Sequence, residues 1–327
     1  MTEYAFEDLQ PGLALTFGPV TIDRDAIVAF ARAYDFQPFH VDEAAARAGF
    51  AGGLIASGWH TCALAMRLLC DGFVLRSTSM GSPGVAEVRW LRPVRPGDTF
   101  SARLTVKEAR PSRSKPDRGL VRCFLEAQDG AGATVMTQDF TVFFARRGAA
   151  PEPRAAAVEA APMTAASDLP TLRPAPPRPY LEDLVPGTVE TFEPRLFTPE
   201  AVVAFARAFD PQPFHVDEAA ARASHFGGLC ASGWQTAATW MRQMLLHRGL
   251  SDDGARIGPS PGFRDMRWLK PVYAGDTVTY DTTLTGTRAS GSRPGWGFVL
   301  AHNTGRNQRG ETVFSFDSTV LWERRPG

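Results

Sequence analysis

The chain has 327 residues, which is enough for one large domain or two of ordinary size. Lys and Arg together number 35, as do Asp and Glu, so no global charge points to a nucleic acid or an anionic membrane as the partner. The hydrophobic fraction of 44% is typical of a soluble globular protein, and no apolar run is long enough to span a bilayer. Because the N-terminal residues lack the features of a secretory signal and the four cysteines show no C-x-x-C spacing, we expect a cytoplasmic protein.

The sequence contains one long segment twice. Residues 31–61 and 206–236 are identical at 24 of 31 positions. Shorter matches at offsets of 175 and 178 extend the duplication, pairing residues 8–12 with 183–187 and 89–94 with 267–272. A repeat of this length indicates a duplicated domain. The sequence therefore predicts two copies of one domain, residues 1–147 and 180–327, joined by an Ala/Pro-rich linker over 148–179.

Capping residues predict where the first helices of each copy begin. The residues that precede helical patterns and can cap them are Asp23, Asp42, Thr198 and Asp217. We expect the first of these helices to run through Tyr34 and the second to close at Gly49. Longer helices are expected over roughly 53–70 and 228–247, and their nearly uniform apolar composition is typical of buried helices.

The rest of each copy alternates apolar and polar residues in the pattern of β-strands. The clearest alternating positions are Phe100, Ala102, Leu104 and Val106 in the first copy, and Val278, Tyr280, Thr282 and Leu284 in the second. Asp129-Gly130 and Arg309-Gly310 predict hairpin turns. A buried helix followed by an antiparallel meander predicts an α+β fold, with the sheet curled around the helix.

Each copy carries an Asp and a His five residues apart, Asp35 with His40 and Asp210 with His215. Pro38 disfavours helix at the residue before it, so we expect the preceding helix to end near Asp35 and the next residues to be extended. A carboxylate beside an imidazole can hold a water and share its protons near neutral pH. A structural alternative stays open, in which the Asp caps a turn and the His is a satisfied core residue.

Small residues stand at the start of each predicted buried helix, as Ser57-Gly58 and Ser232-Gly233. Free backbone N–H groups at such a position can hold a developing oxyanion, and glycine lets a carbonyl approach the backbone closely. Tight helix packing that needs a small residue is the alternative interpretation.

The pattern D-x-Q-P-x-H-x-D, followed by a Gly-rich turn into an A-S-G-W helix, resembles the MaoC-like hydratase/dehydratase family, the (R)-specific enoyl-CoA hydratases. The resemblance covers both copies and implies two hot-dog domains in tandem, each an antiparallel sheet wrapped around a long helix. It also implies site residues, namely the catalytic pairs Asp35/His40 and Asp210/His215, and Gly58 and Gly233 as the glycines that polarise the thioester carbonyl. The family motif usually has Asn where this chain has Gln37 and Gln212.

The activity that the resemblance implies is the addition of water to an enoyl-CoA, or its removal from a 3-hydroxyacyl-CoA, without a metal or redox cofactor. Three alternatives stay open: a mesaconyl-CoA-type hydratase of branched or dicarboxylic acyl-CoA, a non-catalytic acyl-thioester-binding protein, and a thioesterase-like hot-dog protein. Because both copies keep the Asp and the His, we expect two working sites.

The implied partner is a thioester of coenzyme A or of acyl carrier protein. Basic residues between the predicted strands are candidates for binding the phosphates of coenzyme A: Arg113, Lys115, Arg118 and Arg293. Relatives with one hot-dog domain per chain pair two domains into one long sheet, so we expect the two copies to pack as a pseudo-twofold pair. A homodimer of such chains is a further expectation.

Overall fold

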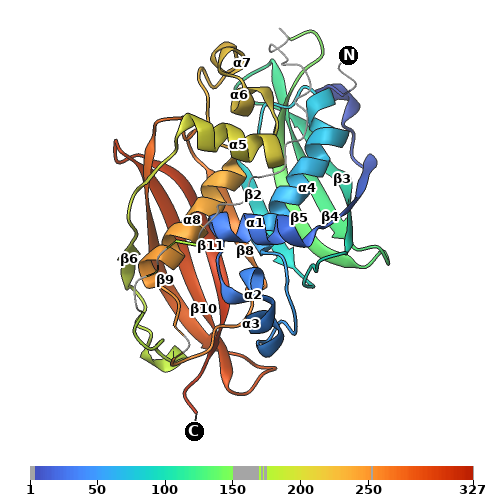
Figure 1. Ribbon diagram of the computed structural model, residues 1–327. Helices are drawn as coiled ribbons and strands as arrows, with labels where there is room; N and C mark the ends of the chain where they lie inside the picture. The colour runs from blue at the N-terminus through green and yellow to red at the C-terminus, as the bar shows by residue number, and fades with distance from the viewer. Residues whose placement is uncertain (1–3, 150–168, 171, 173–174, 252, 327) are drawn as a thin grey trace.

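The computed structural model describes residues 4–149, 169–170, 172, 175–251 and 253–326. Most of the predicted linker over 148–179 lies outside the described residues. The remainder forms two similar halves, which we call repeat 1 (residues 4–149) and repeat 2 (residues 175–326). In each half the helices come first and antiparallel strands follow (Figure 1).

All four predicted caps are confirmed, because each capping side chain accepts a hydrogen bond from a backbone N–H of the first helical turn. The capped helices are α1 (Arg24–Tyr34) and α3 (Glu43–Ala48) in repeat 1, and α5 (Pro199–Phe209) and α7 (Glu218–Ala223) in repeat 2. Each is short, and its apolar side faces the core.

The segment after Asp35 corrects one prediction. Gln37 is extended, as expected, but Pro38 begins a further short helix, α2 (Pro38–Val41), and repeat 2 has its counterpart α6 (Pro213–Val216). Proline fits the first position of a helix because its fixed φ suits the helix and its missing N–H would have had no partner there. The His of each copy therefore lies on a helical turn, and the expected extended stretch is limited to the residues before the proline.

The buried helices are α4 (Gly58–Gly72) and α8 (Gly233–Arg248). Each begins five residues later than predicted. In repeat 1 the reason is local, because Gly52 and Gly53 adopt positive φ angles that a helix does not allow. Both helices bury aromatic and small apolar residues in one continuous core that extends through both repeats.

The strands of repeat 1 are β1 (Ala14–Thr21), β2 (Gly84–Trp90), β3 (Thr99–Pro111), β4 (Arg118–Gln128) and β5 (Thr134–Ala145). Those of repeat 2 are β6 (Val189–Thr191), β7 (Arg195–Leu196), β8 (Gly262–Trp268), β9 (Thr277–Ala289), β10 (Trp296–Asn307) and β11 (Thr312–Glu323). Short 3₁₀ turns lie at η1 (Phe6–Asp8), η2 (Val74–Arg76) and η3 (Leu181–Asp183). The predicted hairpin turns join β4 to β5 and β10 to β11, which confirms them.

The two repeats share a single sheet, with strand order β1-β3-β4-β5-β2-β8-β11-β10-β9-β6 and β7 paired with β9. Antiparallel pairing of β2 with β8 joins the halves, with Val85 opposite Met266 and Val88 opposite Phe263. Glycine is needed at this junction, because a Cβ atom on Gly262 would lie 1.9 Å from the carbonyl oxygen of Val88. The expectation that the copies pack as a pseudo-twofold pair is confirmed.

The helices lie together on one face of this sheet, with α4 and α8 next to each other (Figure 1). Each first helix packs against the central helix of the other repeat, α1 on α8 and α5 on α4. The arginine side chains of these helices also cross the boundary: Arg67 donates to the carbonyl oxygen of Arg207 at 2.7 Å. No helix in the described part of the chain is long and apolar enough to cross a membrane.

Candidate functional site

Each repeat brings its predicted Asp and His together. We call the pair Asp35/His40 site 1 and the pair Asp210/His215 site 2. In both sites the Nε2 atom of the His lies 3.5 Å from the Oδ2 atom of the Asp, and both side chains are buried. The Asp ends the first helix of its repeat and the His lies on the short helix that Pro begins, so the backbone itself sets the approach of the two groups.

The Asp carboxylate is held by the same two donors in each repeat. In site 2 the Ser232 hydroxyl donates to Oδ2 at 2.6 Å and the Gln212 amide donates to Oδ1 at 2.9 Å. In site 1 the donors are Ser57 at 2.6 Å and Gln37 at 2.8 Å. The Gln that replaces the usual Asn of the motif therefore orients the carboxylate, and the Ser at the helix start does the same from the other side.

The His ring is oriented by a backbone carbonyl. Nδ1 of His215 lies 2.7 Å from the carbonyl oxygen of Cys230, and Nδ1 of His40 lies 2.8 Å from that of Ile55. A carbonyl oxygen can only accept, so this hydrogen bond assigns the proton of the neutral ring to Nδ1. Nε2 is then an unprotonated acceptor that faces the carboxylate.

Site 2 has a third donor, which has no counterpart at site 1 among the residues that the structure describes. The Cys70 thiol, on α4 of repeat 1, lies 3.5 Å from Oδ1 of Asp210. Burial, with the nearby Asp210 charge as a smaller cause, raises the pKa of the Cys70 thiol well above its ordinary value, so the sulfur keeps its proton and can donate. The aligned residue of repeat 2 is Leu245, which has no proton to donate.

Both interpretations of the glycines can be examined at the starts of α4 and α8. A Cβ atom on Gly233 would lie 2.3 Å from the Trp268 ring, and one on Gly58 would lie 2.5 Å from the Trp90 ring. Tight packing therefore requires glycine at both positions. As the first residues of their helices, both also have N–H groups without an acceptor in the helix, so the oxyanion role stays a prediction.

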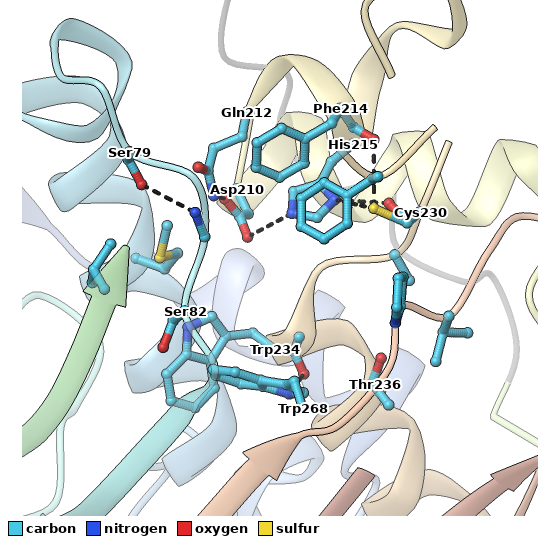
Figure 2. A pocket seen from close by; sticks show the side chains of 18 of the residues that line it. Ser79, Ser82, Asp210, Gln212, Phe214, His215, Cys230, Trp234, Thr236 and Trp268 are labelled. Atoms are coloured by element: carbon cyan, nitrogen blue, oxygen red, sulfur yellow. Dashed lines mark hydrogen bonds and ion pairs between the residues drawn. The ribbon is translucent and has the colours of Figure 1, made fainter. Parts of the chain in front are cut away.

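A cavity of about 210 Å³ opens beside site 2. Asp210, His215 and Gly233 line it, and the indoles of Trp234 and Trp268 lie across from the acid and the imidazole (Figure 2). Repeat 1 supplies much of the rest of the wall, including Met66, Leu69, Val85, Gln138, Phe140 and Val142. The site is therefore built by both repeats, with the reactive groups from repeat 2 and the opposite wall from repeat 1.

Aromatic residues of repeat 2 occupy the matching region near site 1. Trp59, the counterpart of Trp234, stacks on Phe263 with ring centroids 5.2 Å apart and contacts Phe316 edge-on at 5.7 Å. Trp240 completes the cluster, with its ring 4.8 Å from that of Phe316. All four rings are buried.

The other predicted residues fall outside this cavity. Arg113 and Lys115 lie between β3 and β4, Arg118 begins β4, and Arg293 lies between β9 and β10. None of these four is among the described residues that line the cavity, and their role in binding phosphate stays a prediction. The cavity wall does include Lys270, which forms an ion pair with Glu311 at 2.5 Å.

Sequence reasoning missed Gln138, Cys70 and Lys270. A residue-by-residue alignment of the two copies could have revealed the first two. It aligns Gln138 with Phe316 and Cys70 with Leu245. Such exchanges between polar and apolar residues at otherwise equivalent core positions mark the places where the two halves differ.

Comparisons of the sequence and of the structure with known proteins point to the same family. The family described as "MaoC like domain" matches residues 9–122 and 183–294. A mesaconyl-CoA hydratase of Cereibacter sphaeroides is 38% identical over 64 residues, which are 20% of this chain and only 18% of that protein. The solved structure of a putative MaoC domain protein dehydratase from Chloroflexus aurantiacus aligns with a TM-score of 0.78 at 17% identity, covering 100% of this chain and 99% of that one.

A conserved hypothetical protein of Mycobacterium tuberculosis, described as having a double hotdog fold, aligns with a TM-score of 0.72. The identity is 17%, and the alignment covers 97% of this chain and 98% of that one. These likenesses show that the described sheet and helices form a double hot-dog fold, which confirms the predicted fold class.

Proposed function

The chain belongs to the MaoC-like family in both of its repeats, and from this premise we propose that site 2 adds water to an enoyl thioester or removes it from a 3-hydroxyacyl thioester. The thioester is one of coenzyme A or of acyl carrier protein. The observation that carries the proposal is the buried Asp210/His215 pair, which lines a cavity together with the first backbone amide of a helix.

The pair suits a bound water because both facing atoms are acceptors. Nε2 of His215 is unprotonated in the neutral ring, and Oδ2 of Asp210 is a carboxylate oxygen. A water on the cavity side of these two atoms, which are 3.5 Å apart, can donate one proton to each, which turns its lone pair toward the cavity. This arrangement prepares the oxygen for attack on an electrophilic carbon.

In the hydration direction the water oxygen bonds to Cβ of the enoyl group while one water proton passes to the Asp210/His215 pair. The π electrons of the C=C bond move toward the thioester carbonyl, and the N–H of Gly233 stabilises the negative charge on its oxygen. The pair then delivers a proton to Cα, so that one H and one OH have been added. Dehydration follows the same steps in reverse.

A mesaconyl-CoA-type activity is the second candidate. Two observations favour it: the partial match to a mesaconyl-CoA hydratase, and the buried amide of Gln138 in the cavity wall, which can hydrogen-bond to a polar group on the acyl chain. Among the described residues this amide hydrogen-bonds only to sulfur atoms, those of Met136 and Cys62, which are weak hydrogen-bonding groups.

The test is to incubate the purified chain separately with crotonyl-CoA and mesaconyl-CoA, following the enoyl absorbance and free thiol. Loss of absorbance without thiol release is the expected result, and the faster substrate distinguishes the two candidates. The crotonyl-CoA product should be the (R)-3-hydroxyacyl thioester, which chiral chromatography can determine. Release of free CoA would instead identify a thioesterase, and binding of both thioesters without reaction would identify an acyl-binding protein.

A further inference from the structure

The two sites have the same Asp/His pair but are surrounded by different side chains. The part of the cavity wall that repeat 1 supplies to site 2 includes Val85 and Gln138. The pseudo-twofold relation of the repeats places Phe263 and Phe316 at the corresponding positions, where both contact Trp59. Two side chains that leave a cavity in one half are therefore replaced by two phenyl rings in the other.

These phenyl rings belong to a packed cluster. Phe263 and Phe316 lie 5.8 Å apart, and each contacts Trp59. Trp240, which replaces Ala65 of repeat 1, packs against Phe316 from the central helix. At most 5% of any of the three side chains from repeat 2 is exposed, so the rings are fixed on all sides.

We propose that this aromatic plug, defined as Trp240, Phe263 and Phe316, closes site 1 to acyl chains, so that each chain binds and converts its thioester at site 2 alone. The inference rests on the proposed function for the identity of the ligand. It replaces the sequence-based expectation of two working sites.

Asp35 and His40 have a structural role that would keep them in the sequence even if site 1 converts no substrate. Asp35 accepts hydrogen bonds from Gln37 and from Ser57 at the start of α4. His40 is tied through Nδ1 to the carbonyl oxygen of Ile55. These contacts fasten the end of α1, the turn α2 and the start of α4 to one another, and they are the same contacts that orient site 2.

The number of ligands bound per chain tests the inference directly. The probe is butyryl-CoA, a saturated thioester that has no double bond to hydrate, titrated into the wild-type chain by calorimetry. One molecule bound per chain is expected. Two bound per chain would overturn the inference, and no binding at millimolar probe would overturn both it and the proposed function.

Exchanging the two walls provides a matched pair of variants. Val85→Phe with Gln138→Phe places the repeat 2 residues beside site 2, and the number of butyryl-CoA molecules bound should fall from one to none. Phe263→Val with Phe316→Gln does the reverse beside site 1, and the number should rise to two. Circular dichroism and thermal unfolding establish that each variant folds. If both folded variants still bind one butyryl-CoA per chain, the role of the plug is overturned.

The titration separates this inference from the proposed function because it requires no turnover. One butyryl-CoA bound without any hydration of crotonyl-CoA or mesaconyl-CoA would contradict the proposed function and leave the single open site in place. Two butyryl-CoA molecules bound, together with hydration, would contradict the closure of site 1 and leave the proposed function in place.

Discussion

Site 1 and site 2 have the same local construction but different surroundings. In each, Ser donates to the Asp at 2.6 Å and the His lies 3.5 Å from the same carboxylate. The difference comes from the opposite repeat, which places phenyl and indole rings near one pair and a cavity beside the other. The Asp/His motif is therefore encoded within one repeat, whereas part of the wall around it is encoded in the other.

The largest expected effect is on turnover. Asp210→Asn removes a group that we propose for proton transfer at the open site, and kcat on the preferred enoyl-CoA should fall by ~10²–10⁴-fold. Asp35→Asn changes the same atom in site 1 and should retain most of the wild-type kcat. Steady-state kinetics of both proteins, with melting temperatures as a check on folding, provide the comparison. Equal losses of about half in each variant would mean that both sites work.

A smaller effect is expected from filling the open cavity with one ring. Gln138→Phe introduces the residue that repeat 2 has at this position, and KM should rise by roughly tenfold or more because the acyl group loses space. Gln138→Leu is the matched control, since its volume is close to that of Gln, and it should raise KM for crotonyl-CoA much less. A KM for Gln138→Phe equal to that of the wild type would show that this wall does not contact the acyl chain.

Replacing Cys70, the repeat 1 thiol that contacts Asp210 of repeat 2, should have a moderate effect on kcat. Cys70→Ala removes a donor to Asp210, and we expect kcat to fall by roughly fivefold, the equivalent of about 1 kcal/mol for one hydrogen bond. Cys70→Ser restores a donor and should recover activity. Leu245→Ala, at the aligned position, should lower the melting temperature through a cavity while kcat stays near wild type. If Cys70→Ser is as slow as Cys70→Ala, the thiol acts by packing.

The smallest effect on activity is expected at His60, which is buried, stacked on Phe30 at 4.7 Å, and has an Nδ1 without a hydrogen-bond partner among the described residues. Burial lowers the pKa of His60 to about 3. The aligned residue, Gln235, instead donates to the carbonyl oxygen of Ala201 at 2.8 Å. The fold therefore keeps His60 neutral at pH values at which the unfolded chain would protonate it, so acid favours the unfolded state.

The change in the free energy of unfolding with pH follows from the difference in proton binding between the folded and unfolded states. The unfolded histidine binds a proton below pH ~6.5, whereas the folded one does so only near pH 3, so the free energy of unfolding should decrease as the pH falls through this window. His60→Gln should remove about 1.4 kcal/mol per pH unit of that slope, measured by urea unfolding between pH 4 and 6. A slope equal to that of the wild type would place a charged His60 in the folded protein.

Much of this fold could be predicted from local sequence signals. The caps at Asp23 and Thr198 and the hairpin at Asp129-Gly130 are determined by residues a few positions apart, and all were confirmed. Pairing of the repeats followed from the duplication and the family resemblance. The helical turn that begins at Pro38 was missed because proline both excludes helix before it and favours helix after it.

The candidate site was predicted only as far as one repeat determines it. The Asp and His pairs converge as expected, because a single turn places them together. The cavity was not predictable in this way, since its far wall carries Gln138 from a strand about seventy residues before Asp210 in the sequence. Which wall faces which pair depends on the pairing of β2 with β8, a long-range contact that no local pattern encodes.

The β2–β8 junction also changes what a substitution can do. In a dimer of identical chains every amino-acid exchange occurs twice, so a phenylalanine that filled one cavity would fill its twin as well. Here the two sides of the junction are separate stretches of one gene product, and each can change alone. In the fused molecule one half can therefore pack aromatic rings at positions where the other half keeps a cavity. Two identical subunits cannot differ in this way.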